Sequence, residues 1–308
     1  MSKENTKVHL FQKHLIVWPG AMLCCALWGS AFPCIKIGYQ LFDISGSDTA
    51  SVILFAGLRF TLAGILTVLI GSCLAKQFLY PKNGAAPRVL RLSMLQTVLQ
   101  YLFFYIGLAH TSGVKASIIN AVNVFVALLV SCLIFRQEKL SSKKIVGCAV
   151  GFAGVVLINM SGMNFDFHLT GEGFIFLSTV AYAFSSVYMK KFSAVDHPVM
   201  LSGYQFIFGG VIMTAAGIVM GGTITTITPN GILLLIYLAL VSAVAYSLWG
   251  ILLKHNPVSR IAVFGFMTPV FGVIMSALFL NEAAQATGIV SLISLVLVCI
   301  GIYVVNRG

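Results

Sequence analysis

Ten apolar segments, each about as long as a helix needs to cross a lipid bilayer, dominate this 308-residue sequence. They lie near residues 15–37, 50–72, 90–110, 114–135, 142–160, 171–191, 199–221, 231–253, 258–280 and 284–305. Charged residues make up only 9% of the chain, against about 25% in an ordinary soluble domain, so they are too few to cover a water-facing surface. The sequence therefore predicts an all-α integral membrane protein with ten transmembrane helices.

The few charges also predict how the chain is oriented. Sixteen of the nineteen Lys and Arg residues fall in the two tails and in every second connection between spans. The other three are Lys36 and Lys115, on the opposite side, and Arg59, inside a span. This is the positive-inside pattern, so we expect both termini in the cytoplasm and a location in the cell (plasma or inner) membrane. The net charge of +11 thus indicates topology, and no nucleic-acid partner is expected.

An internal repeat relates the two halves of the chain. Residues 113–138 match residues 257–282 at a constant offset of 144 positions, which pairs Glu138 with Glu282. Each half holds five spans, an odd number, so the second half must enter the membrane in the opposite orientation. We expect two inverted five-helix repeats, residues 1–160 and 161–308. Many secondary transporters have this architecture, with the substrate site near the bilayer midplane between the halves.

Short motifs spread over nearly the whole chain carry a family resemblance. They are Trp-Gly-Ser-Ala-Phe-Pro-Cys-Ile-Lys at 28–36, Leu-Arg-Phe at 58–60, the glutamates that close the fourth and ninth spans, Glu138 and Glu282, and Gly147 and Gly154 in the fifth span. In these motifs the chain resembles the EamA type of the drug/metabolite transporter superfamily. It departs from the family pattern where Phe125 replaces the mid-span proline that the second half keeps as Pro269. The resemblance implies a ten-helix transporter.

Arg59 is the one ionisable residue clearly inside a span. An arginine at that depth costs about 2.5–3.5 kcal/mol on insertion scales, so its side chain should face the bundle interior or a wet cavity. Two interpretations stay open. Arg59 is either a counter-charge for a substrate carboxylate or phosphate, or a structural arginine that reaches the interface or binds helix-end carbonyls.

Polar and aromatic side chains in other spans complete the candidate substrate site. Asn120 and Asn123 give the fourth span a polar stripe, which would serve a substrate or hydrogen bonds between helices equally well. The repeat places Phe264 and Met267 at the equivalent positions of the ninth span, so we expect a hydrogen-bonding wall and an aromatic wall. The further candidates are aromatic residues of other spans: Trp28, Tyr101, Tyr105, Tyr182 and Tyr246.

Enzymatic and metal chemistry find no support in the sequence. The six histidines are scattered singly, and the seven cysteines form no CxxC pair. We therefore predict no enzyme, no catalytic residue, no metal and no cofactor. No carboxylate lies in the middle of a span, so facilitated diffusion or exchange is at least as well supported as proton antiport.

Together these features predict a secondary transporter that moves small amphipathic metabolites by alternating access between the repeats. Amino acids or their derivatives are the first candidates, and export is the expected direction. Two alternatives remain: a carrier of anionic solutes such as sugar nucleotides or phosphate esters, which would want more than one buried cation, and a non-enzymatic channel-like membrane protein. The expected partners are a small-molecule substrate and the lipid bilayer, with both a monomer and a homodimer left open.

Overall fold

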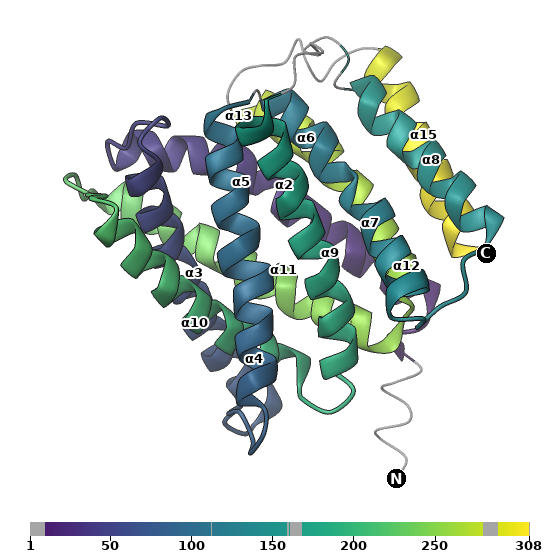
Figure 1. The fold of residues 1–308 in the computed structure, drawn as a ribbon, viewed down its shortest axis with the longest axis horizontal. Coiled ribbons are helices and arrows are strands. Elements are labelled where there is room, and N and C mark those ends of the chain that lie inside the picture. The colour runs from purple at the N-terminus through teal and green to yellow at the C-terminus, as the bar shows by residue number, and fades with distance from the viewer. Residues whose placement is uncertain (1–9, 112, 159, 161–167, 280–288, 308) are drawn as a thin grey trace.

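A computed structural model describes residues 10–111, 113–158, 160, 168–279 and 289–307, which form ten helical segments (Figure 1). Each segment overlaps one of the ten predicted spans. In chain order they are α2 (His14–Leu41); α3 (Thr49–Ala75); α4 (Ala86–Leu92) with η1 (Ser93–Leu99) and α5 (Gln100–Ala109); α6 (Gly113–Ala121) with α7 (Asn123–Leu129) and η2 (Val130–Ile134); α8 (Ser142–Ile158); η4 (Leu169–Gly173) with α9 (Phe174–Phe192); α10 (Pro198–Val219); α11 (Pro229–His255); α12 (Val258–Ala262) with η5 (Val263–Phe266) and α13 (Met267–Phe279); and α15 (Ile289–Asn306).

Length and composition show which of the helices are long and apolar enough to span a membrane without interruption. Five described helices qualify, namely 14–41, 49–75, 86–108, 198–219 and 229–255, and three shorter apolar stretches lie at 118–134, 258–272 and 292–306. Several spans are built from joined pieces because they change helix type along their length: η1 and η2 are π-helical and η5 is a 3₁₀ turn. The all-helical, membrane-spanning fold class is confirmed.

Local signals in the sequence explain where several helices begin. The Asp48 side chain accepts a hydrogen bond from the backbone nitrogen of Ser51 at 3.2 Å and so caps α3. Thr228 caps α11 in the same way, through the backbone nitrogen of Gly231 at 3.0 Å. Proline opens both α10 and α11, where its missing N–H is not needed.

Equivalent helices of the two halves pack on each other. Helix α3 lies along α10, and α8 lies along α15 at one edge of the bundle, as Figure 1 shows. Glycines allow the close approach: a Cβ added to Gly57 would lie 2.3 Å from the backbone nitrogen of Thr214, and one added to Gly210 would lie 2.4 Å from that of Thr61. Repeated small residues favour such contacts between helices in a membrane.

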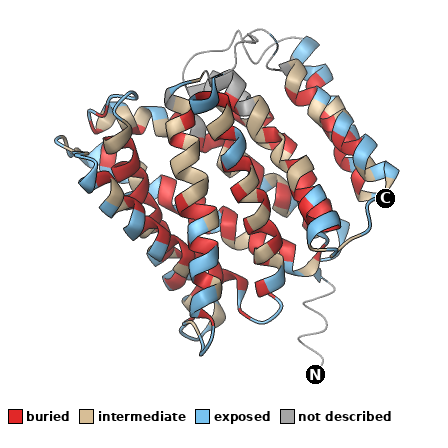
Figure 2. Ribbon diagram, viewed as in Figure 1, coloured by how far each residue is buried: buried red, intermediate tan, exposed pale blue. Residues whose placement is uncertain are grey.

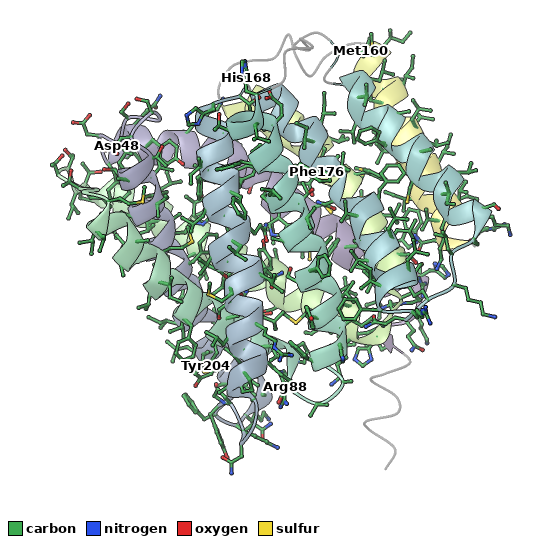
Figure 3. The ribbon with its side chains drawn as sticks, in the orientation of Figure 1. Asp48, Arg88, Met160, His168, Phe176 and Tyr204 are labelled. Atoms are coloured by element: carbon green, nitrogen blue, oxygen red, sulfur yellow. The ribbon has the colours of Figure 1, made fainter. Side chains whose placement is uncertain are left out.

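Both ends of the described chain lie at one end of the bundle, which we call the terminal end. There Gln12 Nε2 donates to the carbonyl of His255 at 3.2 Å, and Arg260 Nε donates to Oδ1 of Asn306 at 3.2 Å. Arg88 also lies toward this end, whereas His168 lies at the opposite one, which we call the distal end (Figure 3). An even number of spans requires the two chain ends to share a side.

Burial divides the helices into inner and outer faces (Figure 2). Large apolar side chains such as Leu74 and Val219 stay exposed, as expected for residues that contact lipid. The buried polar side chains include Arg59, which lies about 15 Å along α3 from its first residue. The predicted boundary between the repeats falls between residues 160 and 161. Residues 161–167 and Glu282 lie outside the described residues.

Candidate functional site

A cavity lies between the two halves, from the middle of the bundle toward the distal end. It encloses about 930 Å³ of empty space, including the solvent at its mouth. Seven of the ten helical segments contribute to its wall. The lining residues are Trp28, Ala31, Ile35, Arg59, Gln100, Tyr101, Phe104, Tyr105, Asn120, Ala121, Asn123, Tyr182, Tyr246, Trp249, Ala262, Gly265, Thr268 and Pro269.

Eight of the ten residues predicted from the sequence line this cavity. They are Trp28, Arg59, Tyr101, Tyr105, Asn120, Asn123, Tyr182 and Tyr246. They come from six helical segments that are distant in the sequence, so the fold brings together what the sequence could only suggest singly. Their role in substrate binding stays a prediction.

Phe264 and Met267 do not line the cavity. Both are buried in the hydrophobic core, and Phe264 packs edge-on against Trp18 with 5.2 Å between the ring centres. The residues of this span that line the cavity are Ala262, Gly265, Thr268 and Pro269. The other three lie three or four positions from Gly265, so they share another face of the helix with it. The expected aromatic wall on the ninth span is therefore a small, weakly polar one.

Arg59 connects the two halves. Its Nη2 atom donates to the Ser242 hydroxyl of α11 at 3.1 Å, and its guanidinium carbon lies 4.7 Å from the ring centre of Phe60. The side chain is only 4% exposed, and its Nε and Nη1 atoms have no hydrogen-bond partner among the described residues. The arginine thus faces the bundle interior with part of its donor capacity unused.

Aromatic rings from both halves meet in the middle of the cavity wall. The ring of Trp28 on α2 packs edge-on against Tyr246 and Trp249 of α11, with centres 5.1 and 4.9 Å apart. The hydroxyls of Tyr101 and Tyr246 share a hydrogen bond of 2.8 Å across the two halves. The wall therefore offers large apolar surfaces with a few fixed polar groups, which is the usual make-up of a small-molecule site.

Sequence reasoning missed Gln100, Phe104 and Thr268 of the lining. Gln100 could have been found, because a glutamine inside an apolar span calls for a partner and it directly precedes Tyr101. Its Oε1 atom has no hydrogen-bond partner within the described part of the chain. Thr268 gave no comparable signal, since a threonine within a helix can satisfy its hydroxyl on its own backbone.

A polar network closes the bundle at the terminal end. Glu138, in the connection before α8, accepts hydrogen bonds from Lys144 at 3.0 Å and from the Ser259 hydroxyl. Lys190 donates to the carbonyls of Leu253 at 3.2 Å and Asn256 at 2.5 Å. The contact between Glu138 and Ser259 joins the ends of spans from both halves, and the contacts of Lys190 join two spans of the second half.

Acidic and metal-binding groups lie away from the cavity. The acids in the described ranges, Asp43, Asp48, Glu138, Glu172 and Asp196, stand at or beyond helix ends, and none lines the cavity. Within those ranges no group of three or more His, Cys, Asp or Glu residues is placed to hold a metal ion. Of the described lining residues, Arg59 is the one Lys or Arg.

The fold and the site together define a class of protein. Ten helical segments in two repeats, with an interior cavity between the halves, form a multi-pass membrane transporter. A sequence model of the EamA-like transporter family matches residues 17–160 and again residues 169–307, so this chain belongs to the EamA-like transporter family. The two matches confirm that the chain holds two repeats, while their bounds and inverted orientation stay predictions, and the family consists of transporters rather than enzymes.

Individual proteins are similar over different shares of the chain. A probable amino-acid metabolite efflux pump of Escherichia coli strain K12 is 27% identical over 298 residues, which is 92% of both chains. A WAT1-related, chloroplastic protein of Arabidopsis thaliana is 26% identical over 212 residues, and the match covers 65% of this chain and 50% of that protein. One solved crystal structure superposes with a TM-score of 0.77 at 16% identity, over 96% of this chain and 98% of the other, which supports the fold.

Proposed function

We propose that this transporter exports small amphipathic metabolites, with amino acids or their derivatives as the substrate class, by alternating access between its two repeats. One observation carries the proposal: Arg59 is buried at mid-membrane depth beside an aromatic-lined cavity and keeps two nitrogens without partners in the described structure. A carboxylate would receive charge-assisted hydrogen bonds from such an arginine. An apolar side chain would pack against Trp28, Tyr101 and Tyr246.

The proposed direction, export, is supported by a similar protein, while the charge distribution and the hydrogen-bonded end of the bundle indicate how the chain is oriented. The tails and connections at the terminal end carry the excess of Lys and Arg, so we place this end in the cytoplasm. The cavity lies on the distal side of the network around Glu138, as expected for a state that faces outward. The similar Escherichia coli protein is described as a probable efflux pump, which agrees with export.

Transport by the purified chain in proteoliposomes tests the proposal. The panel holds radiolabelled amino acids, their N-acyl and ester derivatives, amines, nucleobases and a sugar nucleotide. We expect saturable transport of at least one amino acid or derivative, stimulated by the same solute on the other side of the membrane. Such counterflow distinguishes a carrier from a channel.

A matched pair of variants links transport to the site. Arg59→Gln removes the buried charge, whereas Arg91→Gln removes an exposed one. We expect the first to abolish transport of carboxylates and the second to leave it unchanged. No transport of any amino acid or derivative would overturn the proposal, and transport of the sugar nucleotide alone would favour a carrier of phosphate esters.

A further inference from the structure

Four polar atoms of cavity-lining residues have no hydrogen-bond partner within the described structure. They are Nε and Nη1 of Arg59, Nε1 of Trp28 and Oε1 of Gln100, and all four are shielded from solvent. Buried polar groups in native proteins are almost always paired, so each exception needs an explanation. Their chemistry is asymmetric, because three are donors and one is an acceptor.

The charge of the cavity is asymmetric as well. Arg59 places one positive charge in the wall, and no Asp or Glu stands among the lining residues that the structure describes. A carboxylate that enters the cavity loses hydrogen bonds to water and gains charge-assisted hydrogen bonds from the Arg59 guanidinium. The ammonium group of a zwitterion would lose water, meet no carboxylate and share a low-dielectric space with Arg59. A phosphate dianion would find one cation where it needs two.

We infer that the preferred substrates are monocarboxylic acids whose nitrogen carries no charge, with N-acyl amino acids as the class that fits best. This inference rests on the proposed function and narrows its substrate class. These atoms are shielded in the ligand-free structure, so the side chains must turn toward the ligand when it binds. The carboxylate would then accept from Arg59, the amide carbonyl would accept from Trp28 Nε1, and the amide N–H would donate to Gln100 Oε1. Each unpartnered atom of the wall then has a complementary group on the ligand.

The aromatic part of the wall suits the rest of such a molecule. Phe60 and Tyr101 have ring centres 4.3 Å apart, and Phe206 and Tyr246 have ring centres 4.9 Å apart. These pairs hold the tyrosine rings in place beside Arg59. An apolar or aromatic acid therefore buries its side chain against fixed rings while its carboxylate stays at the arginine.

Binding of four related ligands to the full chain in lipid nanodiscs at pH 7 tests the inference. N-acetyl-L-phenylalanine, 3-phenylpropionate, L-phenylalanine and 2-phenylethylamine share a phenyl ring and differ in their charged and amide groups. We expect N-acetyl-L-phenylalanine to bind at least about tenfold tighter than L-phenylalanine, with 3-phenylpropionate between them. We expect no measurable binding of 2-phenylethylamine.

Two variants separate the contacts. Gln100→Glu supplies the missing carboxylate and should raise the affinity for L-phenylalanine relative to 3-phenylpropionate by about tenfold. The matched control is Gln40→Glu, at an exposed position outside the cavity. It should leave the affinity for both ligands unchanged. Trp28→Phe keeps a ring but removes the indole N–H. It should weaken binding of N-acetyl-L-phenylalanine severalfold more than that of 3-phenylpropionate, which has no amide and shares only the ring contact.

The outcomes distinguish this inference from the proposed function. L-Phenylalanine that binds as tightly as its N-acetyl derivative overturns the inference, while transport of amino acids would still stand. Failure of all four ligands to bind, together with no transport of any amino acid or derivative, overturns both. Should Gln100→Glu fail to fold, the order of the four ligands on the unaltered protein decides the question alone.

Discussion

The carboxylate of Glu138 accepts hydrogen bonds from both the backbone nitrogen of Ser259, at 3.2 Å, and the Ser259 hydroxyl. Glu138 follows the fourth span and Ser259 begins the ninth, so this contact joins equivalent spans of the two repeats at the terminal end. We predict that these two residues separate when the cavity opens toward that end. We call the pair the latch, because its hydrogen bonds would stabilise the arrangement that is closed there.

Weakening this latch should shift the balance between the two faces of the transporter. Hydrogen bonds to a charged group contribute about 1.5–3 kcal/mol, so Glu138→Gln should raise the population open toward the terminal end by roughly ten- to a hundredfold. The measurement uses a cysteine-free background with Ala262→Cys, a lining position, and a membrane-impermeant maleimide applied from the terminal side. Lys139→Gln, an exposed neighbour, is the control. Unchanged labelling in Glu138→Gln would contradict the role of the latch.

The pH dependence of the latch follows from its environment. Burial pushes the pKa of Glu138 up, but hydrogen bonds from Ser259 and Lys144 outweigh burial and hold the pKa below its ordinary value. A carboxyl group with a lowered pKa stabilises the arrangement in which it is hydrogen-bonded. This stabilisation is fully present above the ordinary pKa of Glu, about 4.3, and is lost as the pH falls through the lowered pKa. Maleimide reacts with the thiolate, whose fraction falls with pH, so labelling of Ala262→Cys from the terminal side is divided by that of Lys139→Cys, an exposed reference, at each pH. We expect this ratio to stay constant from about pH 8 to pH 5. An increase within that window would show that Glu138 is not held ionised.

The contact between α3 and α10 predicts a stability effect. A Cβ at position 57 would lie 2.3 Å from the backbone nitrogen of Thr214, and backbone cannot move aside as a flexible side chain can. Gly57→Ala should therefore lower stability by about 1–3 kcal/mol, measured as the unfolding temperature in detergent. Gly46→Ala is the matched control, because nothing lies within 4 Å of its added Cβ. Equal unfolding temperatures for the two variants would mean that the helices can separate at little cost.

Much of the fold could be predicted because apolar length decides where a chain crosses a bilayer. Each of the ten described helical segments overlaps a span that the sequence predicts, and the seven-residue glycine spacing of α3 and α10 marks the faces that pack together. The changes of helix type could not be predicted. A π-helical turn such as η1 or a 3₁₀ turn such as η5 keeps the apolar composition and alters only the winding, so no periodic pattern reveals it.

The same limit explains which site residues were found. Arg59 and the tyrosines were predicted because a polar group is costly in an apolar span, whatever the exact winding of its helix. Phe264 and Met267 were placed by analogy between the repeats, but the ninth span turns a different face to the cavity and buries both side chains in the core. The hydrogen bond between Tyr101 and Tyr246 joins residues 145 positions apart, and only the packed bundle shows it.

Asn120 offers a final test of substrate binding against structural hydrogen bonding. It lines the cavity and is half-buried, so Asn120→Ala should remove a contact to the substrate while leaving the packing of its span intact. Losing one neutral hydrogen bond costs about 0.5–1.5 kcal/mol, which corresponds to a two- to thirteenfold fall in transport at low substrate concentration. The yield of monodisperse protein and its unfolding temperature should equal those of Asn83→Ala, an exposed loop variant. If yield and transport fall together in Asn120→Ala, Asn120 holds the helices together and does not bind the substrate.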